Sequence, residues 1–374
     1  MRLALVANHD PTDVRKWSGT PFHAWAAIAE AYPDAILINT PRIDQAMQFA
    51  NKFCVRLGFD LFRMRTITKL YAWHLARQLR RARADVLVSV GATHKVSDLD
   101  WAGRILHVSD ALYATVLDNY GKYARLSDGT KRRGDAIQRR ALARIDTVFL
   151  SSKWAADDAA RHYPEFASKM QHAPFGANIY DPGPERLPKS ALKLLFVGSD
   201  WQRKGGDRVV AITRLLRQSH PDCVLDVVGS NPGIASEPGL HVHGRLDKDD
   251  PVDAATLDRL YREAAFLIVL SETEAFGIVF CEAAAYSVPV IATNAGGIPT
   301  IVEDQRTGLL FPVNAEPQDI ARAIESLWSD RPRYEAFAVA ARARFESVLN
   351  WGAWARTIGD AAKRAMSAVS PGNV

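Results

Sequence analysis

The feature that most constrains the fold is a regular alternation of short apolar runs with longer helical patterns, which occurs twice along the chain. Five apolar, β-branched runs in the first half lie at 3–7, 35–39, 85–90, 105–109 and 147–152. Five more in the second half lie at 192–199, 224–230, 240–244, 266–271 and 288–293. Continuous apolar strands separated by helices are typical of parallel sheets buried on both faces. The sequence therefore predicts an α/β protein with two doubly wound, Rossmann-like domains.

A proline-rich segment separates the two series of strands. Residues 177–191 contain three prolines and one glycine, and they show no periodicity. We therefore expect an N-terminal domain at 1–180 and a C-terminal domain at 181–350. The helical pattern after residue 350 is expected to return to the first domain as a segment covering 351–374. Two such domains would face each other across a central cleft, because ligands bind at the carboxyl ends of parallel strands.

Composition restricts the class of protein further. The chain has 374 residues, of which 48% are hydrophobic and 24% charged, as in globular proteins with ample core. The net charge of +5 suits an anionic substrate or surface. The three cysteines, Cys54, Cys223 and Cys281, have no metal-ligand spacing and are expected to be reduced thiols. Membrane contact would be peripheral, because no apolar run reaches about 18 residues. No glycine-rich dinucleotide motif follows a strand, which disfavours a nicotinamide-dependent enzyme.

Two glutamates, Glu274 and Glu282, stand on either side of a predicted helix start. The helix is expected to begin near Phe276 or Gly277, which places Glu282 six steps, or about 9 Å, along its axis. The backbone N–H groups of Phe276, Gly277 and Ile278 would then face an anionic group such as a diphosphate. The alternative is a solvated helix with two incidental glutamates, but Glu282 lies between "VFC" and "AAA", a poor setting for an exposed charge.

This segment resembles the signature of retaining glycosyltransferases of family 4, which have the GT-B fold. The resemblance rests on the Glu-x7-Glu spacing, on "SVPVIATNAGGIPTIV" after the helix and on "TGLLFPV" beyond it, and it extends over about 192–330. Ser287 stands where the family usually has glycine. The resemblance implies that Glu274 contacts hydroxyl groups of a donor sugar and that Glu282 holds the ribose hydroxyls of its nucleotide.

A basic loop opens the second series of strands and resembles the family's diphosphate-binding loop. The loop lies in "LFVGSDWQRKGGDR" at 195–208, and Arg203 and Lys204 occupy the matching positions. Phosphate oxygens require donors and positive charge, and such charge would stabilise a departing nucleoside diphosphate. The alternative is a basic helix start without a role.

The first half resembles the family less closely. Gly19 and Thr20 match a glycine-rich loop that lies near the donor phosphate and the acceptor, where glycine permits close backbone approach. Asp110 follows the strand at 105–109, at a position where the family has His or Asp near the donor sugar. The alternative is that Ser109 or Asp110 is a helix N-cap. His23 is as readily structural as functional.

Two segments are strongly basic. Residues 51–83 contain nine Lys or Arg and one acidic residue, interleaved with Phe and Trp, and residues 121–144 contain eight basic and two acidic residues. This pattern suits a surface that faces anionic lipid. Solvated helix faces are the alternative, and nucleic-acid binding is disfavoured because no recognition motif accompanies the charge.

The resemblance implies an enzyme that moves a sugar from a nucleotide-diphosphate-sugar to an acceptor hydroxyl, with retention, in cell-surface polysaccharide or glycolipid synthesis. The N-terminal domain would take the acceptor, which is a saccharide or is lipid-linked, and the C-terminal domain the donor. Glu274, Asp110 and Lys204 would be catalytic.

No metal or other cofactor is expected, although "DKD" at 247–249 matches the Asp-x-Asp pattern of metal-dependent transferases. The expected location is the cytoplasm, at or near the inner membrane face, because nucleotide sugars are made there. A phosphorylase, a nucleotide-sugar epimerase and a catalytically silent GT-B subunit are the alternatives.

Overall fold

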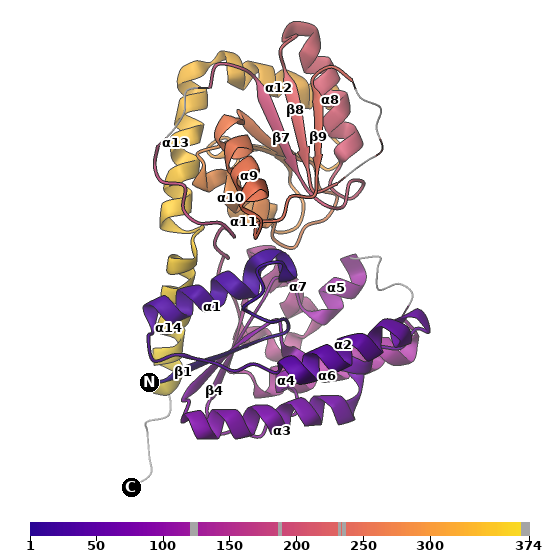
Figure 1. The fold of residues 1–374 in the computed structure, drawn as a ribbon, viewed down its shortest axis with the longest axis vertical. Helices are drawn as coiled ribbons and strands as arrows, with labels where there is room; N and C mark the ends of the chain where they lie inside the picture. The colour runs from indigo at the N-terminus through magenta and orange to yellow at the C-terminus, as the bar shows by residue number, and fades with distance from the viewer. Residues whose placement is uncertain (120–125, 186–188, 231–232, 234–236, 368–374) are drawn as a thin grey trace. The chain divides into compact units, whose positions relative to one another are not determined.

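The computed structural model divides the chain into two compact units, each built on its own parallel sheet (Figure 1). It describes residues 1–374 except 120–125, 186–188, 231–232, 234–236 and 368–374. The first unit contains Met1–Pro174 and Trp351–Val374, and the second contains Phe175–Asn350. The second unit is therefore inserted into the first in sequence.

The sheet of the first unit has six parallel strands in the order β2-β1-β3-β4-β5-β6. Their bounds are β1 Leu3–Ala7, β2 Ile36–Leu37, β3 Val86–Val90, β4 Arg104–Ser109, β5 Thr147–Leu150 and β6 Met170–His172. Every residue of β1 and β3 is buried, as expected for apolar strands covered on both faces. The parallel register places the carboxyl ends of β1, β3 and β4 along one edge of the sheet.

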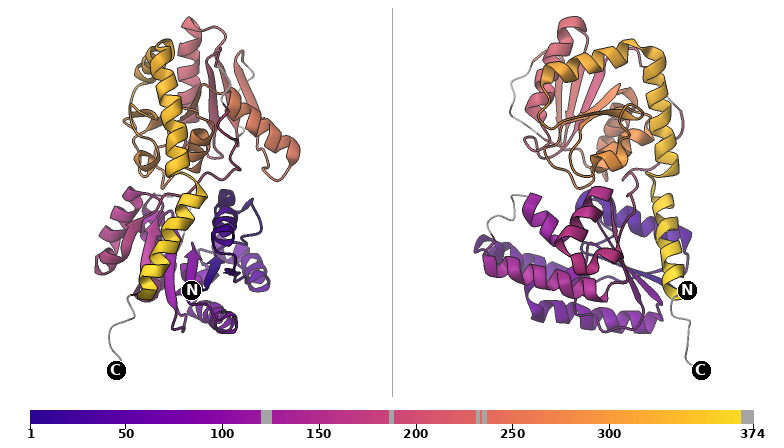
Figure 2. Two further views of the ribbon diagram at one scale, coloured as in Figure 1. Left: turned by 90° about the vertical axis from the view of Figure 1, so that its left-hand side faces the viewer. Right: turned by 180° about the vertical axis from the view of Figure 1, so that it is seen from behind.

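Helices lie on either side of this sheet (Figure 2). The helical segments are η1 Lys16–Gly19, α1 Thr20–Ala31, α2 Pro41–Arg56, η2 Leu61–Arg63, α3 Arg65–Ala82, α4 Thr93–Val96, α5 Tyr113–Asn119, α6 Asp128–Arg144, α7 Lys153–His162, η4 Pro164–Lys169 and α14 Trp351–Ser367.

The last helix, α14, packs against α1 and β4 and so completes the first unit. Trp354 of α14 is 1% exposed. The ring of His23 stacks on Trp351 at 6.5 Å and is nearly buried. The structure therefore gives His23 a packing role.

The second unit has a sheet of six parallel strands in the order β12-β11-β10-β7-β8-β9. Their bounds are β7 Lys193–Val197, β8 Val224–Val228, β9 Leu240–Gly244, β10 Phe266–Val269, β11 Val290–Thr293 and β12 Gly308–Phe311. The helices are α8 Gly206–Ser219, α9 Pro251–Glu263, α10 Ile278–Ala285, α11 Ile298–Ile301, α12 Pro317–Ser329 and α13 Arg331–Ser347. All ten predicted strands are present, and β6 and β12 are additional to them. Within the described ranges, no helix is both long and apolar enough to cross a membrane.

Candidate functional site

The helix α10 begins slightly later than predicted. Its first residue is Ile278, and Gly277 is the N-cap with a φ of 98°. A Cβ at Gly277 would lie 2.5 Å from the ring of Phe280, so the position requires glycine. Glu282 is then four helical steps from the start, or about 6 Å along the axis instead of the expected 9 Å.

The loop that carries Glu274 follows β10 and is held by a glycine pair from a later segment. The N–H of Gly297 donates to the carbonyl oxygen of Glu274 at 2.8 Å. A Cβ at Gly296 would lie 2.1 Å from the same carbonyl oxygen. The close approach of these backbones fixes Glu274 at the carboxyl end of β10.

The basic loop is attached to the same segment by its backbone. The carbonyl oxygen of Arg203 accepts the N–H of Glu272 at 2.9 Å, and that of Lys204 accepts the N–H of Leu270 at 3.1 Å. A Cβ at Gly198 would lie 2.4 Å from Cδ of Lys204, so glycine leaves room for the lysine side chain. These contacts place both cations beside Glu274.

The side chains of Lys204, Arg203 and Glu274 form an ion cluster. Lys204 Nζ donates to Oε2 of Glu274 at 2.9 Å, and Arg203 Nη1 lies 3.5 Å from the same oxygen. Arg203 Nη1 also donates to the carbonyl oxygen of Thr273 at 2.8 Å. Ser271 Oγ donates to Oε2 at 3.4 Å. Among the described residues, no side chain donates to Oε1 of Glu274, which leaves that oxygen able to accept a further hydrogen bond.

Two opposing effects set the ionisation of Glu274. Burial alone would raise the pKa of its carboxyl group, because the side chain is only 12% exposed. The charges and hydrogen bonds of Lys204 and Arg203 outweigh burial and hold that pKa below its usual value. Glu274 is therefore ionised at neutral pH and can only accept hydrogen bonds.

Glu282 lies deeper, in a separate polar cluster. Its side chain is 1% exposed. Lys248 Nζ donates to its Oε1 at 2.5 Å, and the Tyr261 hydroxyl donates to its Oε2 at 3.0 Å. Burial raises the pKa of the Tyr261 hydroxyl, and the neighbouring carboxylate adds to that shift. Lys248 is a residue that sequence reasoning missed, because "DKD" directed attention to its carboxylates.

The two aspartates of "DKD" make local contacts. The carboxylate of Asp247 accepts the N–H of Asp249 at 3.0 Å, and the following Asp250 caps α9. In the part of the chain that the structure describes, no group of three or more His, Cys, Asp or Glu side chains is arranged to hold a metal ion.

The ion pair of Lys248 and Glu282 leads to a prediction about stability. We expect Lys248→Met to lower the free energy of unfolding of the second unit by about 3 kcal/mol, because it leaves a buried carboxylate without its cation. Glu282→Gln should cost less, because the Lys248 side chain is 30% exposed and can be hydrated. Urea denaturation of the two variants measures the difference. An equal or reversed order would show that the pair contributes little.

In the first unit, the loop before α1 has an unusual backbone. Trp17, Ser18 and Gly19 have φ values of 47°, 55° and 92°, all in the left-handed region. The indole of Trp17 lies against Gly91, where a Cβ would approach the ring within 2.9 Å. Consecutive residues in this region persist only where their surroundings hold them. Thr20, the first residue of α1, is 4% exposed.

Asp110 follows β4 at the same edge of this sheet. Trp17 Nε1 donates to its Oδ2 at 3.3 Å. The helix α5 begins at Tyr113, three residues after Asp110, so neither Ser109 nor Asp110 directly precedes it. This spacing disfavours the N-cap alternative, and the bond from Trp17 connects Asp110 to the loop that contains Gly19.

If the chain has the sugar-transfer activity that its sequence resemblance implies, we expect Asp110→Asn to fold normally and to transfer sugar at least about 100-fold more slowly, the scale on which one charged interaction stabilises a transition state. An asparagine oxygen can still accept the Trp17 hydrogen bond, so the change removes charge and keeps the bond to the loop. Steady-state kinetics and a thermal melt measure the two effects. Turnover within a fewfold of the parent protein would show that Asp110 does not contribute to the site.

A second buried cluster in the first unit carried no sequence motif. Lys95 of α4 is 1% exposed, and its Nζ donates to Asp44 Oδ2 and Thr40 Oγ1, each at 2.9 Å. The Tyr71 hydroxyl donates to the same carboxylate at 2.7 Å. Burial lowers the pKa of Lys95, although Asp44 opposes that shift. Neighbouring His94 has a pKa well below its usual value because of burial, so it is neutral.

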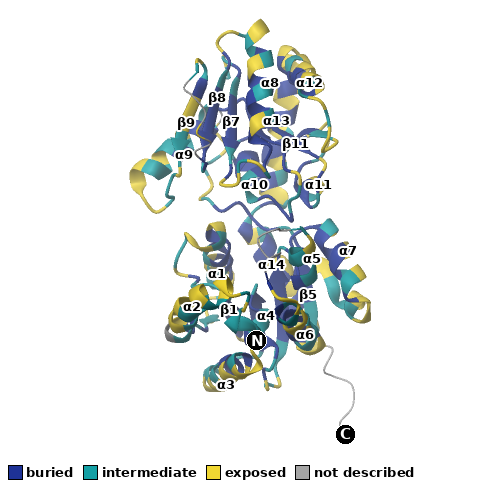
Figure 3. Cartoon of the chain, turned by 90° about the vertical axis from the view of Figure 1, so that its right-hand side faces the viewer, coloured by how far each residue is buried: buried dark blue, intermediate teal, exposed yellow. Residues whose placement is uncertain are grey.

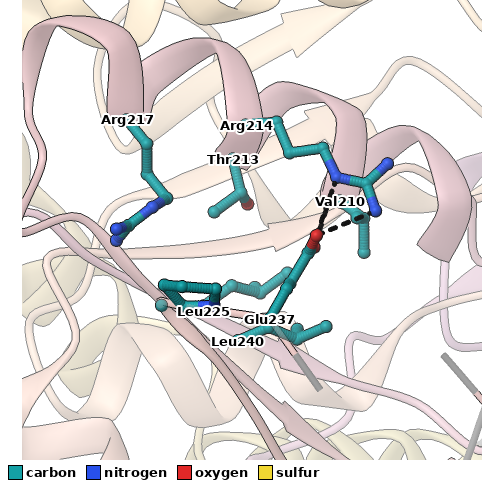
Figure 4. Close-up of a pocket in the computed structure, with 9 residues that line it drawn as sticks. Val210, Thr213, Arg214, Arg217, Leu225, Glu237 and Leu240 are labelled. Carbon is teal, nitrogen blue, oxygen red and sulfur yellow. Dashed lines mark hydrogen bonds and ion pairs between the residues drawn. The ribbon is translucent and has the colours of Figure 1, made fainter. Parts of the chain in front are cut away.

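A pocket of about 260 Å³ lies elsewhere in the second unit, between α8 and the segment around β8 and β9 (Figure 4). Arg214 points at Glu237 across it and donates at 3.0 Å. Arg217 donates to the carbonyl oxygen of Cys223. None of the predicted site residues lines this pocket.

Solved structures first define the class of fold. Sucrose-phosphate synthase from Thermosynechococcus elongatus aligns with 98% of this chain and 99% of its own, with a TM-score of 0.69 and 18% identity. Anabaena Alr3699/HepE in complex with UDP and glucose aligns with 97% of this chain and 99% of its own, with a TM-score of 0.62 and 16% identity. The predicted GT-B fold is thereby confirmed.

Sequence comparisons find a family and relatives that are similar to part of the chain. Residues 181–344 match the family described as Glycosyl transferases group 1. D-inositol 3-phosphate glycosyltransferase of Streptomyces avermitilis is 30% identical over 250 residues, which are 61% of this chain and 53% of the relative. The enzyme of the same name from Paenarthrobacter aurescens is 28% identical over 243 residues, which are 60% and 58%. The chain thus spans a little over half the length of these relatives.

Proposed function

We propose that this protein is a retaining glycosyltransferase, of family 4 type, that moves a hexose from a nucleotide-diphosphate-sugar to an acceptor hydroxyl. The observation that carries the proposal is the ion cluster at the carboxyl end of β10. There, Lys204 and Arg203 converge on one oxygen of Glu274, beside the start of α10. The match of residues 181–344 to the group 1 family supports it.

The cluster has the groups that a departing diphosphate requires. Lys204 and Arg203 provide two positive charges against one carboxylate, and the first N–H groups of α10 add partial positive charge. When donor binds, we infer that the cations turn partly toward phosphate oxygens, where negative charge grows as the sugar bond breaks. Glu274 then accepts hydrogen bonds from sugar hydroxyls, through the oxygen that the described residues leave open. Phe276, Gly277 and Ile278 provide the backbone of this site.

The remaining assignments extend the same proposal. Glu282 holds ribose hydroxyls, with Lys248 and Tyr261 fixing its carboxylate. In a retaining reaction, the acceptor attacks the face of the sugar from which the diphosphate leaves. The leaving diphosphate can then take the proton of the attacking hydroxyl group. The protein then needs groups that orient the sugar more than it needs a strong base. We assign that orienting role to Asp110, and a role near the phosphate to Gly19 and Thr20.

The class of substrate is also proposed. Uridine diphosphate is the first nucleotide to test, because the Anabaena structure was solved with UDP and glucose. An inositol phosphate is the first acceptor to test, because the relatives are named for it. Synthesis of a cell-surface polysaccharide or glycolipid in the cytoplasm fits an enzyme that uses nucleotide sugars. We propose that the reaction needs no metal, since side-chain cations and a helix terminus would neutralise the diphosphate.

Calorimetry followed by product analysis tests this function. UDP, GDP and ADP are titrated with and without EDTA, and one of them is expected to bind equally well in both conditions. A panel of nucleotide sugars is then incubated with acceptor, and NMR of the product reads the anomeric configuration. Sugar transfer to inorganic phosphate would indicate a phosphorylase. A changed configuration at a carbon of the donor sugar, with no net release of nucleoside diphosphate, would indicate an epimerase. Binding without any turnover would indicate a silent subunit.

A further inference from the structure

Large apolar side chains are concentrated on one part of the first unit. Among the described residues, fifteen large hydrophobic side chains are exposed, and eight of these lie within residues 49–73. The eight are Phe49, Phe53, Val55, Leu57, Phe59, Met64, Leu70 and Trp73. We name residues 49–77, which run from α2 through η2 into α3, the α2–α3 surface. Figure 3 shows the exposed residues along both helices in yellow.

The apolar side chains of α2 form a stripe. Phe49, Phe53 and Leu57 are four residues apart and are 69%, 59% and 75% exposed. Side chains at this spacing lie on one helix face. The rings of Phe49 and Phe53 contact each other edge to face at 5.7 Å. Three large side chains that solvent reaches this freely contribute little to the core of the unit, so packing does not explain them.

Cations accompany the stripe. Lys52 and Arg56 are exposed and are also four residues apart on α2. On α3, Lys69 and Arg77 are exposed beside Trp73, and the guanidinium of Arg77 lies 5.9 Å from the Trp73 ring.

The acidic residue of this segment already has partners within the segment. Asp60, the one acid among residues 51–83, accepts from Arg63 Nε at 3.2 Å and caps η2.

The second basic segment adjoins the same surface. The N–H of Ser127 and the hydroxyl of Thr130, at the start of α6, donate to the carbonyl oxygen of Gly58 at 3.2 and 3.1 Å. Arg132 and Arg133, just beyond, are exposed. Residues 121–125 of that basic segment lie outside the described residues. The fold therefore brings the start of α6, which carries the second run of cations, into contact with the turn at Gly58 that follows the first run.

We propose that the α2–α3 surface docks on an anionic lipid bilayer. Aromatic and aliphatic side chains would enter the boundary between head groups and acyl chains, where Trp and Phe partition well. The Lys and Arg side chains are long enough to keep their charges among the lipid phosphates while their stems remain in the apolar layer. Attraction to an anionic leaflet adds to the apolar contribution. The inference does not depend on the proposed sugar transfer.

Other occupants fit the surface less well. A two-fold dimer would place the same patch against itself and bring cation against cation. Single-stranded nucleic acid would suit the cations and rings, but the aliphatic Val55, Leu57, Met64 and Leu70 offer bases no stacking surface. A bilayer accommodates both kinds of side chain at once.

Vesicle sedimentation of the full chain tests the proposal. Vesicles of phosphatidylcholine with one-third phosphatidylglycerol should bind the protein, and those of phosphatidylcholine alone should bind it far less. Lys52→Glu with Arg56→Glu should weaken binding at least about 25-fold, because each cation near an anionic surface contributes about fivefold. Phe53→Ser with Leu57→Ser should weaken it about tenfold or more at unchanged charge.

Matched controls use exposed residues of the second unit. Val339→Ser and Arg322→Glu change side chains of the same kinds that are 57% and 76% exposed, and both should bind vesicles normally. Circular dichroism and a thermal melt check that each variant folds like the parent protein. Equal binding to neutral and anionic vesicles would overturn the proposal. Normal vesicle binding by the Phe53→Ser, Leu57→Ser variant would also overturn it. The same holds if that variant loses affinity for a single-stranded oligonucleotide and keeps its affinity for vesicles.

Discussion

Glu274→Gln is expected to reduce sugar transfer at least about 1000-fold, the largest single effect that we predict. The substitution keeps the shape of the side chain and removes the charge that Lys204 and Arg203 surround. Two cations would then face a neutral amide, and the amide nitrogen could donate where a carboxylate oxygen accepts. Both changes misplace the donor sugar, and positioning errors of this kind act strongly on the transition state.

Nucleotide affinity separates this role from simple binding. Glu274→Gln should bind nucleoside diphosphate about as tightly as the parent protein. Glu282→Gln should lose about tenfold or more, because a hydrogen bond to a charged group is worth about 1.5–3 kcal/mol. Glu272 is exposed two residues before Glu274, and Glu272→Gln is the matched control that should leave both quantities unchanged. Equal losses of nucleotide affinity in the Glu274 and Glu282 variants would contradict the division of roles.

Lys204→Met is expected to lower turnover about 100- to 1000-fold, with a smaller change in the Michaelis constant for the donor. An interaction that strengthens as charge develops on the leaving group affects the catalytic step more than ground-state binding. The control is Lys193→Met. Lys193 pairs with Glu263 at 2.8 Å, but it stands at the amino end of β7, far along the strand from the basic loop. Unchanged turnover with weaker donor binding would show that Lys204 binds the donor and does not stabilise the leaving group.

The same variant should change the dependence on pH. In Lys204→Met, burial still raises the pKa of the Glu274 carboxyl group, and only the charge of Arg203 remains to lower it. That pKa should therefore rise. The parent protein keeps Glu274 ionised until the pH falls through its lowered pKa. The acid limb of the rate profile should therefore move to higher pH in Lys204→Met. A limb at the parent position would mean that Lys204 does not hold the charge of Glu274.

The strands were predictable because they are buried on both faces and read as continuous apolar runs. The two that sequence reasoning missed, β6 and β12, are both edge strands. Met170–His172 is short, and two of its three residues are exposed. Gly308–Phe311 begins with glycine and is only partly buried. A strand with one neighbour needs fewer apolar residues, so its sequence carries a weaker signal.

The site was predictable where it depends on local spacing and unpredictable where it depends on long-range contacts. Glu274, Gly277 and Glu282 follow from one segment. Their contacts come from elsewhere: Lys204, which the resemblance placed at the diphosphate and not against Glu274, is 70 residues from that glutamate, and Lys248, which was not predicted, is 34 residues from Glu282. Only the order of β7, β10 and the loop before α9 brings them together, and no local pattern encodes that order.

Ser287 is a further position whose backbone conformation could not be predicted from the sequence. It stands where related sequences were expected to have glycine, and its φ is 57°. The left-handed backbone at this helix end is shaped by Val288, whose N–H donates to the carbonyl oxygen of Ala283 at 2.9 Å. The structure thus explains why glycine suits the position, and it shows that serine adopts the same conformation here, at a cost of about 1–2 kcal/mol.

The place of α14 has a consequence for synthesis on the ribosome. The strands of the first unit are made first, but the helix that covers α1 and β4 is made last, after all of Phe175–Asn350. At about 5–20 residues per second, those intervening residues take roughly 10–35 s to translate. During that interval the surface that receives Trp354 and Ile358 stays open to chaperones and to other nascent chains.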